Sequence, residues 1–284
     1  MKTTSKLRRA FVLAALFFCV TTSGHSREGG FTFQKNVMIA MSDGTELAAN
    51  LFLPKEGESF PTILMRTPYQ YTPWYLHSDG DAKNPDGSGA LKLVKSKAGK
   101  VDAFVYDPSD PAPTMGGNNL VATPIGPYDQ SEVEQRDDIL VYTSESLKQA
   151  VEVTGPVKMV LYAATTAKDT DFTAKLVDVH PDGKAYNLCD GIIRARWRNS
   201  RSKAELVKPG EIVKYEIDLW VTSNWFKVGH KIRVEISSSN FPRFDRNPNS
   251  GDPFGADTEV FKATQSIHHD EKYSSHILLP IIPR

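Results

Sequence analysis

The feature that most restricts the fold is a series of short apolar segments separated by turn residues, which begins near residue 101. Candidate strands lie at residues 139–143, 151–163, 171–179, 188–196, 213–220, 231–237 and 277–282. In residues 231–236 (KIRVEI) every second side chain is apolar, as in a strand with one buried face. No amphipathic helical pattern lies beyond residue 130. Many strands without intervening helices predict an antiparallel β-sandwich or jelly roll.

The N-terminal region has a different residue pattern. Residues 31–41 (FTFQKNVMIAM) and 45–53 (TELAANLFL) predict two strands joined by Asp43-Gly44, a strong hairpin turn. Residues 61–65 (PTILM) form a short apolar run suited to a buried strand. These segments predict a small group of strands that precedes the larger strand-rich region.

Residues 1–26 predict a secretory signal peptide. The apolar run at residues 10–20 is too short to span a bilayer, and it follows a basic segment with Lys2, Lys6, Arg8 and Arg9. Small residues at 21–24 predict cleavage between Gly24 and Arg27. A buried N-terminal helix and a lipid anchor on Cys19 are the alternatives, and the bulky residues before Cys19 disfavour the anchor. The sequence thus predicts export, with no membrane span after cleavage.

Charge and cysteine content narrow the function classes. The 34 basic residues balance the 34 acidic ones, and signal removal leaves 30 against 34, which gives no case for nucleic-acid binding. Cys189 would then be the only cysteine, which excludes an intrachain disulfide and a thiolate metal cluster. Cys189 could act as a nucleophile, but a buried small hydrophobe is the favoured interpretation.

The remaining candidate chemistry is sparse. None of the histidines falls in a known metal-binding spacing, so no metal or cofactor is predicted; they are His25, His77, His180, His230, His268, His269 and His276. Asp169 and Asp171 could share a strand face for acid–base or calcium chemistry. A jelly roll could stack sugars on Trp220 and Trp225, although core or interdomain packing of the tryptophans is favoured. Strand alternation would place Arg194, Arg196 and Arg198 on one face, solvated or facing another domain.

Several segments, in the same order, carry a resemblance to one family. They are residues 41–54 (MSDGTELAANLFLP), 64–69 (LMRTPY), 106–117 (YDPSDPAPTMGG), 126–130 (GPYDQ), 136–144 (RDDILVYTS), 169–179 (DTDFTAKLVDV), 191–196 (GIIRAR), 226–233 (FKVGHKIR) and, most distinctively, 237–247 (SSSNFPRFDRN). The chain resembles the cocaine-esterase-like and Xaa-Pro dipeptidyl-peptidase (CocE/NonD) serine hydrolases.

The resemblance implies an α/β-hydrolase domain followed by a galactose-binding-like jelly roll. Such hydrolases cleave small esters or peptides with a Ser-His-Asp triad, and Tyr69 matches the family tyrosine of the oxyanion hole. The family likeness also implies a scaffold role for His230 and a loop-anchoring role for Asp169 and Asp171. It implies no cofactor.

The chain departs from the family where the catalytic residues should lie. Residues 71–72 run directly into 73–80 (PWYLHSDG), which resembles the entry to the jelly roll, so most of the catalytic domain is missing. The nucleophile elbow Gly-x-Ser-x-Gly is also absent, because Pro61 follows Gly57-Glu58-Ser59 where glycine is needed. The expected organisation is a signal peptide at 1–26, a remnant of the α/β-hydrolase sheet at 27–72 and a jelly roll at 73–284.

Two functional hypotheses follow from this organisation. The first is a truncated, secreted member of the serine hydrolase family that is inactive alone, because it lacks the nucleophile and the triad Asp and His. The alternative is a non-catalytic secreted jelly roll that binds carbohydrate or protein. An in-frame deletion in the gene or its assembly would give the same arrangement, and sequencing across codons 66–80 distinguishes that origin.

The loss of the hydrolase domain predicts an exposed apolar patch near residues 60–75. In the full family architecture this region would be covered by the rest of the hydrolase sheet, and exposed apolar patches promote association. We expect the purified chain to self-associate and to increase the fluorescence of a hydrophobic dye. Light scattering that shows a monodisperse monomer, together with no dye binding, would contradict this expectation.

Overall fold

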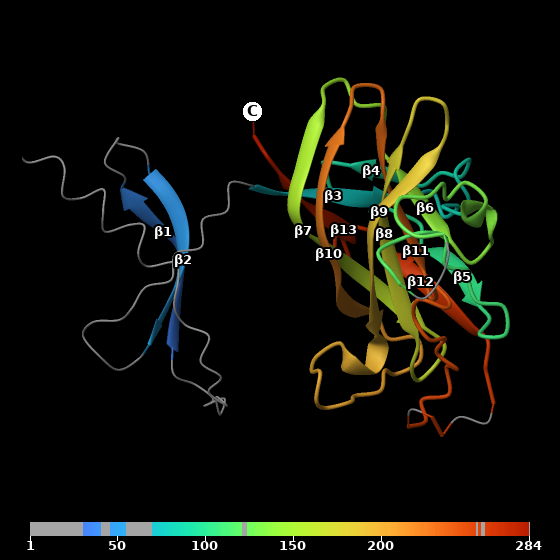
Figure 1. The fold of residues 1–284 in the computed structure, drawn as a ribbon. Coiled ribbons are helices and arrows are strands. Elements are labelled where there is room, and N and C mark those ends of the chain that lie inside the picture. The colour runs from blue at the N-terminus through green and yellow to red at the C-terminus, as the bar shows by residue number, and fades with distance from the viewer. Residues whose placement is uncertain are drawn as a thin grey trace, which may run out of the picture. The chain divides into compact units, whose positions relative to one another are not determined.

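The computed structural model describes residues 31–40, 46–54, 70–120, 124–253, 255–256 and 259–283. The chain divides into two compact units, Met1–Arg66 and Thr67–Arg284. Both units contain β-strands and are visible in Figure 1. Each is described by itself below.

The first unit contains one antiparallel hairpin. Strand β1 (Phe31–Ala40) pairs with β2 (Glu46–Pro54), and the register shifts by a bulge between Gln34 and Val37. The two N-terminal strands expected from the sequence are confirmed. The Asp43-Gly44 turn and the expected strand at residues 61–65 lie outside the described residues.

The second unit is an eleven-stranded sheet. Its strands are β3 (Gln70–His77), β4 (Ala90–Lys92), β5 (Asp102–Tyr106), β6 (Leu140–Thr143), β7 (Val151–Thr165), β8 (Asp171–Val179), β9 (Ala185–Arg194), β10 (Val213–Phe226), β11 (Lys231–Ser237), β12 (Ala263–His268) and β13 (His276–Ile281). The only helical elements among the described residues are two single 3-10 turns, η1 (Val133–Gln135) and η2 (Ala195–Trp197). None of these described helical turns is long or apolar enough to cross a bilayer. The prediction of a mainly β chain is therefore confirmed.

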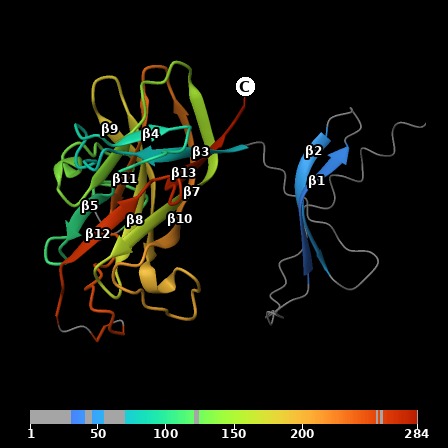
Figure 2. The same ribbon diagram turned by 180° about the vertical axis from the view of Figure 1, so that it is seen from behind.

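The seven strands expected beyond residue 130 all form, with ends shifted by a few residues. The longest differences are in β10, which continues to Phe226, and in β9, which begins at Ala185. Strands β3, β4, β5 and β12 had no clear sequence signal. Figure 2 shows β3, β4 and β13 adjoining one another on the side opposite to Figure 1. These short or irregular strands are specified by their partners and not by their own alternation.

The strands form two layers of a sandwich around one apolar core. The sheet order is β5-β12-β7-β13-β3-β4-β6-β11-β8-β9. Strands β12 and β13 pair with successive stretches of one edge of β7, and β10 pairs with its other edge. Strands β4 and β6 are joined by a single parallel pair, Ala90 with Thr143. Side chains of both halves bury one shared cluster, including Leu76 and Met159 from the first half and Phe172 and Ile236 from the second. Burial of this cluster excludes water between the layers.

The outer face of the second layer is also covered, and its polar side chains are buried. The alternation in β11 predicted an exposed face, yet Arg233 and Glu235 are 7% and 2% exposed. Arg233 donates to Glu134 across 2.5 Å, and Lys175 of β8 lies 3.1 Å from Glu235. Glu134 belongs to η1, in the long connection before β6. The polar residues are thus ion-paired beneath a loop instead of solvated.

Close approach of β9 and β10 requires glycine at position 191. A Cβ built on Gly191 would lie 1.9 Å from the carbonyl oxygen of Asp218. We expect Gly191→Ala to lower the free energy of unfolding by about 3 kcal/mol, because backbone must shift to relieve the overlap. Urea unfolding measures the loss.

Gly210→Ala is the matched control. Gly210 has a φ of +81°, but nothing lies within 4 Å of its added Cβ, so only backbone strain of about 1 kcal/mol is expected. Equal losses in the two variants would mean that the β9–β10 contact does not require glycine.

Candidate functional site

The structure offers no serine-hydrolase machinery in the part of the chain that it describes. Tyr69, the one catalytic position implied by the family resemblance, and Ser59 lie outside the described residues. Most described imidazoles contact backbone oxygens or aspartates, as His77 does with Val94, whereas His268 packs against Tyr273. No described Ser, Thr or Cys side chain hydrogen-bonds to an imidazole. A nucleophile–base pair for acyl transfer is therefore not present among these residues.

One buried cluster has the residue types of a triad in a different arrangement. Ser78 donates to Oδ1 of Asp102 across 2.7 Å, whereas His269 Nε2 lies 2.8 Å from Oδ2. Tyr142 also donates to Oδ2. The carboxylate separates the serine from the histidine, so the imidazole cannot take the serine proton. Since all of these side chains are buried, the cluster braces β3, β5, β6 and β12.

Asp169 and Asp171 anchor a loop instead of presenting free carboxylates. Asp169 accepts from Nε of Arg196 across 2.7 Å, and Asp171 accepts two bonds from Arg194, of 2.8 and 2.9 Å. Asn247 donates to both carboxylates, at 3.0 and 2.9 Å. The arginine and asparagine donors beside these carboxylates are therefore already hydrogen-bonded within the protein. The contacts agree with the anchoring role that the family resemblance implied.

The arginine series does not form one solvated strand face. Strand β9 ends at Arg194, and η2 then turns the chain, so Arg194, Arg196 and Arg198 do not alternate as a strand would. Arg198 instead donates to the carbonyl oxygen of Ala195. The expectation of solvated arginines on a common face is wrong, because a 3-10 turn changes the direction of the side chains.

A pocket of about 550 Å³ lies over these pairs. It is lined in part by Arg194, Arg196, Trp197 and Leu206. The guanidinium groups at its floor are engaged by Asp171, Asp245 and the carbonyl oxygen of Asp252. The pocket therefore offers packing surface, with its charges neutralised internally.

Cys189 is buried as expected, whereas Trp220 and Trp225 are exposed. Burial raises the pKa of the Cys189 thiol to about 12, so the buried-hydrophobe interpretation is confirmed and a thiolate nucleophile is disfavoured. Trp74 lies in the core. Trp220 is 64% exposed and Trp225 is 40% exposed, so core packing is wrong for these two residues.

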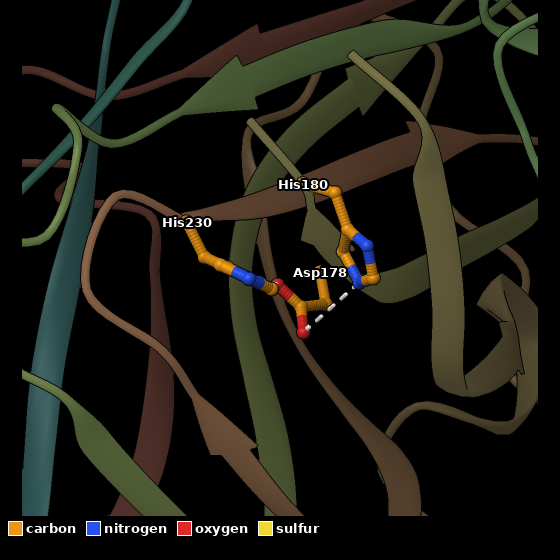
Figure 3. Close-up of side chains that lie close together, drawn as sticks. All are labelled: Asp178, His180 and His230. Carbon is orange, nitrogen blue, oxygen red and sulfur yellow. Dashed lines mark hydrogen bonds and ion pairs between the residues drawn. The ribbon is translucent and has the colours of Figure 1, made fainter. Parts of the chain in front are cut away.

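The described residues also bring together two histidines and one aspartate. Figure 3 shows the carboxylate of Asp178 between the imidazoles of His180 and His230. Oδ1 of Asp178 lies 2.8 Å from Nδ1 of His230, and Oδ2 lies 3.8 Å from Nε2 of His180. The three ligand atoms all lie within 4.8 Å of one another. Imidazole and carboxylate are the ligand types of zinc and related transition metals.

The sequence signal for this cluster was only partial. Asp178 and His180 are two residues apart at the end of β8, which places both on one face. His230 is fifty positions further along and approaches from the turn between β10 and β11. A search for short metal-binding spacings cannot find a ligand that only the sheet pairing brings close.

Comparison with known protein families shows which family the chain belongs to. Residues 60–278 match the model described as the X-Pro dipeptidyl-peptidase C-terminal non-catalytic domain. The chain belongs to this family. The match spans the irregular strands β3 to β5, the regular strands β6 to β12 and the first residues of β13. Membership agrees with the resemblance to CocE/NonD hydrolases and with the β-sandwich.

The individual relatives are longer proteins, and this chain matches only part of each. Cocaine esterase from Rhodococcus sp. (strain MB1 Bresler) is 46% identical over 217 residues, which are 75% of this chain and 38% of the esterase. An aminopeptidase from a marine sediment Thaumarchaeota archaeon has a TM-score of 0.67 at 30% identity, over 75% of this chain and 37% of its own. An α-amino acid ester hydrolase has a TM-score of 0.65 at 26% identity, over 74% and 36%. The chain thus spans less than two fifths of the length of each.

The buried pair of Asp171 and Arg194 makes a prediction about stability. Burial raises the pKa of Asp171 against the opposing effect of Arg194, so the pair does not fully offset its desolvation. Removal of the carboxylate still leaves Arg194 and Asn247 without their shared partner. We expect Asp171→Ala to lower the free energy of unfolding by about 3 kcal/mol.

Asp245→Ala is the control, because Asp245 contacts the same arginine but its side chain is 58% exposed. A loss below about 1 kcal/mol is expected there. Both values come from urea unfolding, and equal losses would show that burial does not decide the strength of these contacts.

Proposed function

We propose that this chain is an exported, C-terminal β-sandwich unit of the CocE and X-Pro dipeptidyl-peptidase hydrolase group, without hydrolytic activity of its own. The observation that carries the proposal is the match of residues 60–278 to a family model described as non-catalytic, and the 46% identity to cocaine esterase over 217 residues supports it. The partner implied by this role is an α/β-hydrolase domain, and the substrates are small esters or peptides. Export is proposed from the signal-like residues 1–26.

The chemistry of the described residues supports inactivity. Acyl transfer needs a nucleophile, a base that receives its proton and donors for the oxyanion. Ser78 and His269 share an aspartate but do not contact each other, and the thiol of Cys189 is buried. Tyr69 alone could supply one oxyanion donor, which stabilises a negative charge but does not attack a carbonyl carbon.

The sandwich is suited to a supporting role. Its core is continuous between two layers, and its outer polar face is held by buried ion pairs such as Arg233 with Glu134. Tyr71, at the start of the unit, is 46% exposed. We propose contact with a hydrolase domain, and self-association when that domain is absent, from the family organisation and from this one exposed aromatic side chain.

The direct test is an assay of the purified mature chain on p-nitrophenyl esters and Xaa-Pro amides. No turnover above the buffer rate is expected, with cocaine esterase as the positive control. Intact mass measurement of exported protein checks cleavage between Gly24 and Arg27. Turnover that is abolished by a serine-directed inhibitor and retained after Tyr69→Phe would overturn the proposal.

A chimera tests the supporting role itself. Residues 67–284 replace the matching region of cocaine esterase, and the chimera is expected to be soluble and to retain measurable esterase activity. The matched control is cocaine esterase that ends before this region. Equal activity of the chimera and the shortened control would show that the sandwich contributes nothing to catalysis.

A further inference from the structure

We propose that Asp178, His180 and His230 form a zinc site that joins the turn after β8 to the turn before β11. The proposal rests on the side chains and the backbone of these two turns. It does not depend on any hydrolase activity of the chain.

The donor atoms have nearly the spacing that zinc requires. Zinc–ligand distances of 2.0–2.2 Å place tetrahedral ligand atoms about 3.4 Å apart. Nδ1 of His230 lies 2.8 Å from Oδ1 of Asp178, and Nε2 of His180 lies 3.8 Å from Oδ2, so the two imidazoles face different oxygens of the carboxylate. The three ligand atoms lie within 4.8 Å of one another, so side-chain rotation would be needed to bring them around one ion. His180 can rotate most readily, because its side chain is 38% exposed.

The backbone that carries the ligands is fixed. Asp178 lies between two neighbours in the sheet, paired with Ile232 of β11 and Tyr186 of β9. The amide of His180 donates to Lys184 across 2.8 Å and closes the β8–β9 hairpin. Since these positions are set before an ion arrives, little conformational entropy is lost on binding.

The turn that carries His230 is also held by the backbone. The amide of His230 donates to the carbonyl oxygen of Lys227, and its own carbonyl oxygen accepts from Leu147. His230 therefore approaches Asp178 from a closed turn and not from a loose loop. The pairing of β8 with β11 ends at Val179 and Lys231, and an ion would bridge the side chains just beyond that end.

The pair of Asp178 and His230 offers donors to a cation. Nδ1 of His230 lies 2.8 Å from Oδ1 of Asp178, which is hydrogen-bond distance. Zinc would take the lone pair of Nδ1, with the ring proton on Nε2. Asp178 and His230 are 5% and 7% exposed, so the ion would sit among poorly hydrated donors. The charge of the ion would offset the charge of the buried carboxylate.

The donor set favours zinc over magnesium or calcium. Two imidazoles and one carboxylate suit zinc and its transition-metal neighbours, whereas magnesium and calcium prefer oxygen ligands. Three protein ligands leave a fourth position, which solvent can fill on the exposed side of His180. Asn224 donates to Oδ2 of Asp178 at 3.4 Å and can orient the carboxylate as a further hydrogen-bond partner.

The test is calorimetric titration of the chelator-treated mature chain with ZnCl₂, together with thermal unfolding. One zinc ion per chain and a rise in Tm are expected, with no effect of MgCl₂. Loading with CoCl₂ gives an independent signature, because coordination by the imidazoles changes the visible absorption of the ion.

Three variants make the result specific. His180→Ala and Asp178→Asn are expected to weaken zinc binding by more than about 100-fold, beyond the effect of losing an outer-shell residue. His77→Ala removes a histidine outside the cluster, bonded only to the backbone of Val94, and should leave binding unchanged. The proposal is overturned if zinc does not bind saturably, or if His180→Ala and Asp178→Asn bind it as tightly as the unaltered chain.

Discussion

The shared apolar core between the two layers is the constraint on which the second unit depends. Strand β7 runs for fifteen residues and pairs with β10 on one edge and with β13 and β12 on the other. Its buried side chains, such as Met159 and Leu161, meet the facing layer in one cluster. Because every strand is held by this burial, even strands with poor intrinsic pattern, such as β4, are fixed by their neighbours.

Buried charge is the second organising feature, and it explains why acidic residues here are poor evidence for catalysis. Asp169, Asp171 and Asp102 each accept from side chains of distant segments. A carboxylate whose acceptor sites are filled by arginine, asparagine or tyrosine ties loops to the sandwich and has no free lone pair directed at a substrate. These buried carboxylates stabilise the scaffold of the described residues.

Much of the strand content and the family relationship could be predicted from the sequence, but the environment of single side chains could not. Residues 171–179 were expected as a strand and form β8 over that same range. Lys175 within it gave no sign of its contacts with Gln130 and Glu235. The Asp178–His180–His230 cluster was missed for the same reason, since its members meet only through the pairing of β8 with β11.

The sequence by itself determined that the chain is rich in strands, that it resembles a family of serine hydrolases and that it has only two cysteines, Cys19 and Cys189. Those conclusions follow from local periodicity, ordered motifs and residue counts. Only the tertiary structure decided that Arg233 and Glu235 are buried under a loop, that Trp220 is exposed and that a carboxylate lies between two imidazoles. Alternation along one strand fixes which residues share a face, but the loop or turn that covers that face comes from distant parts of the chain.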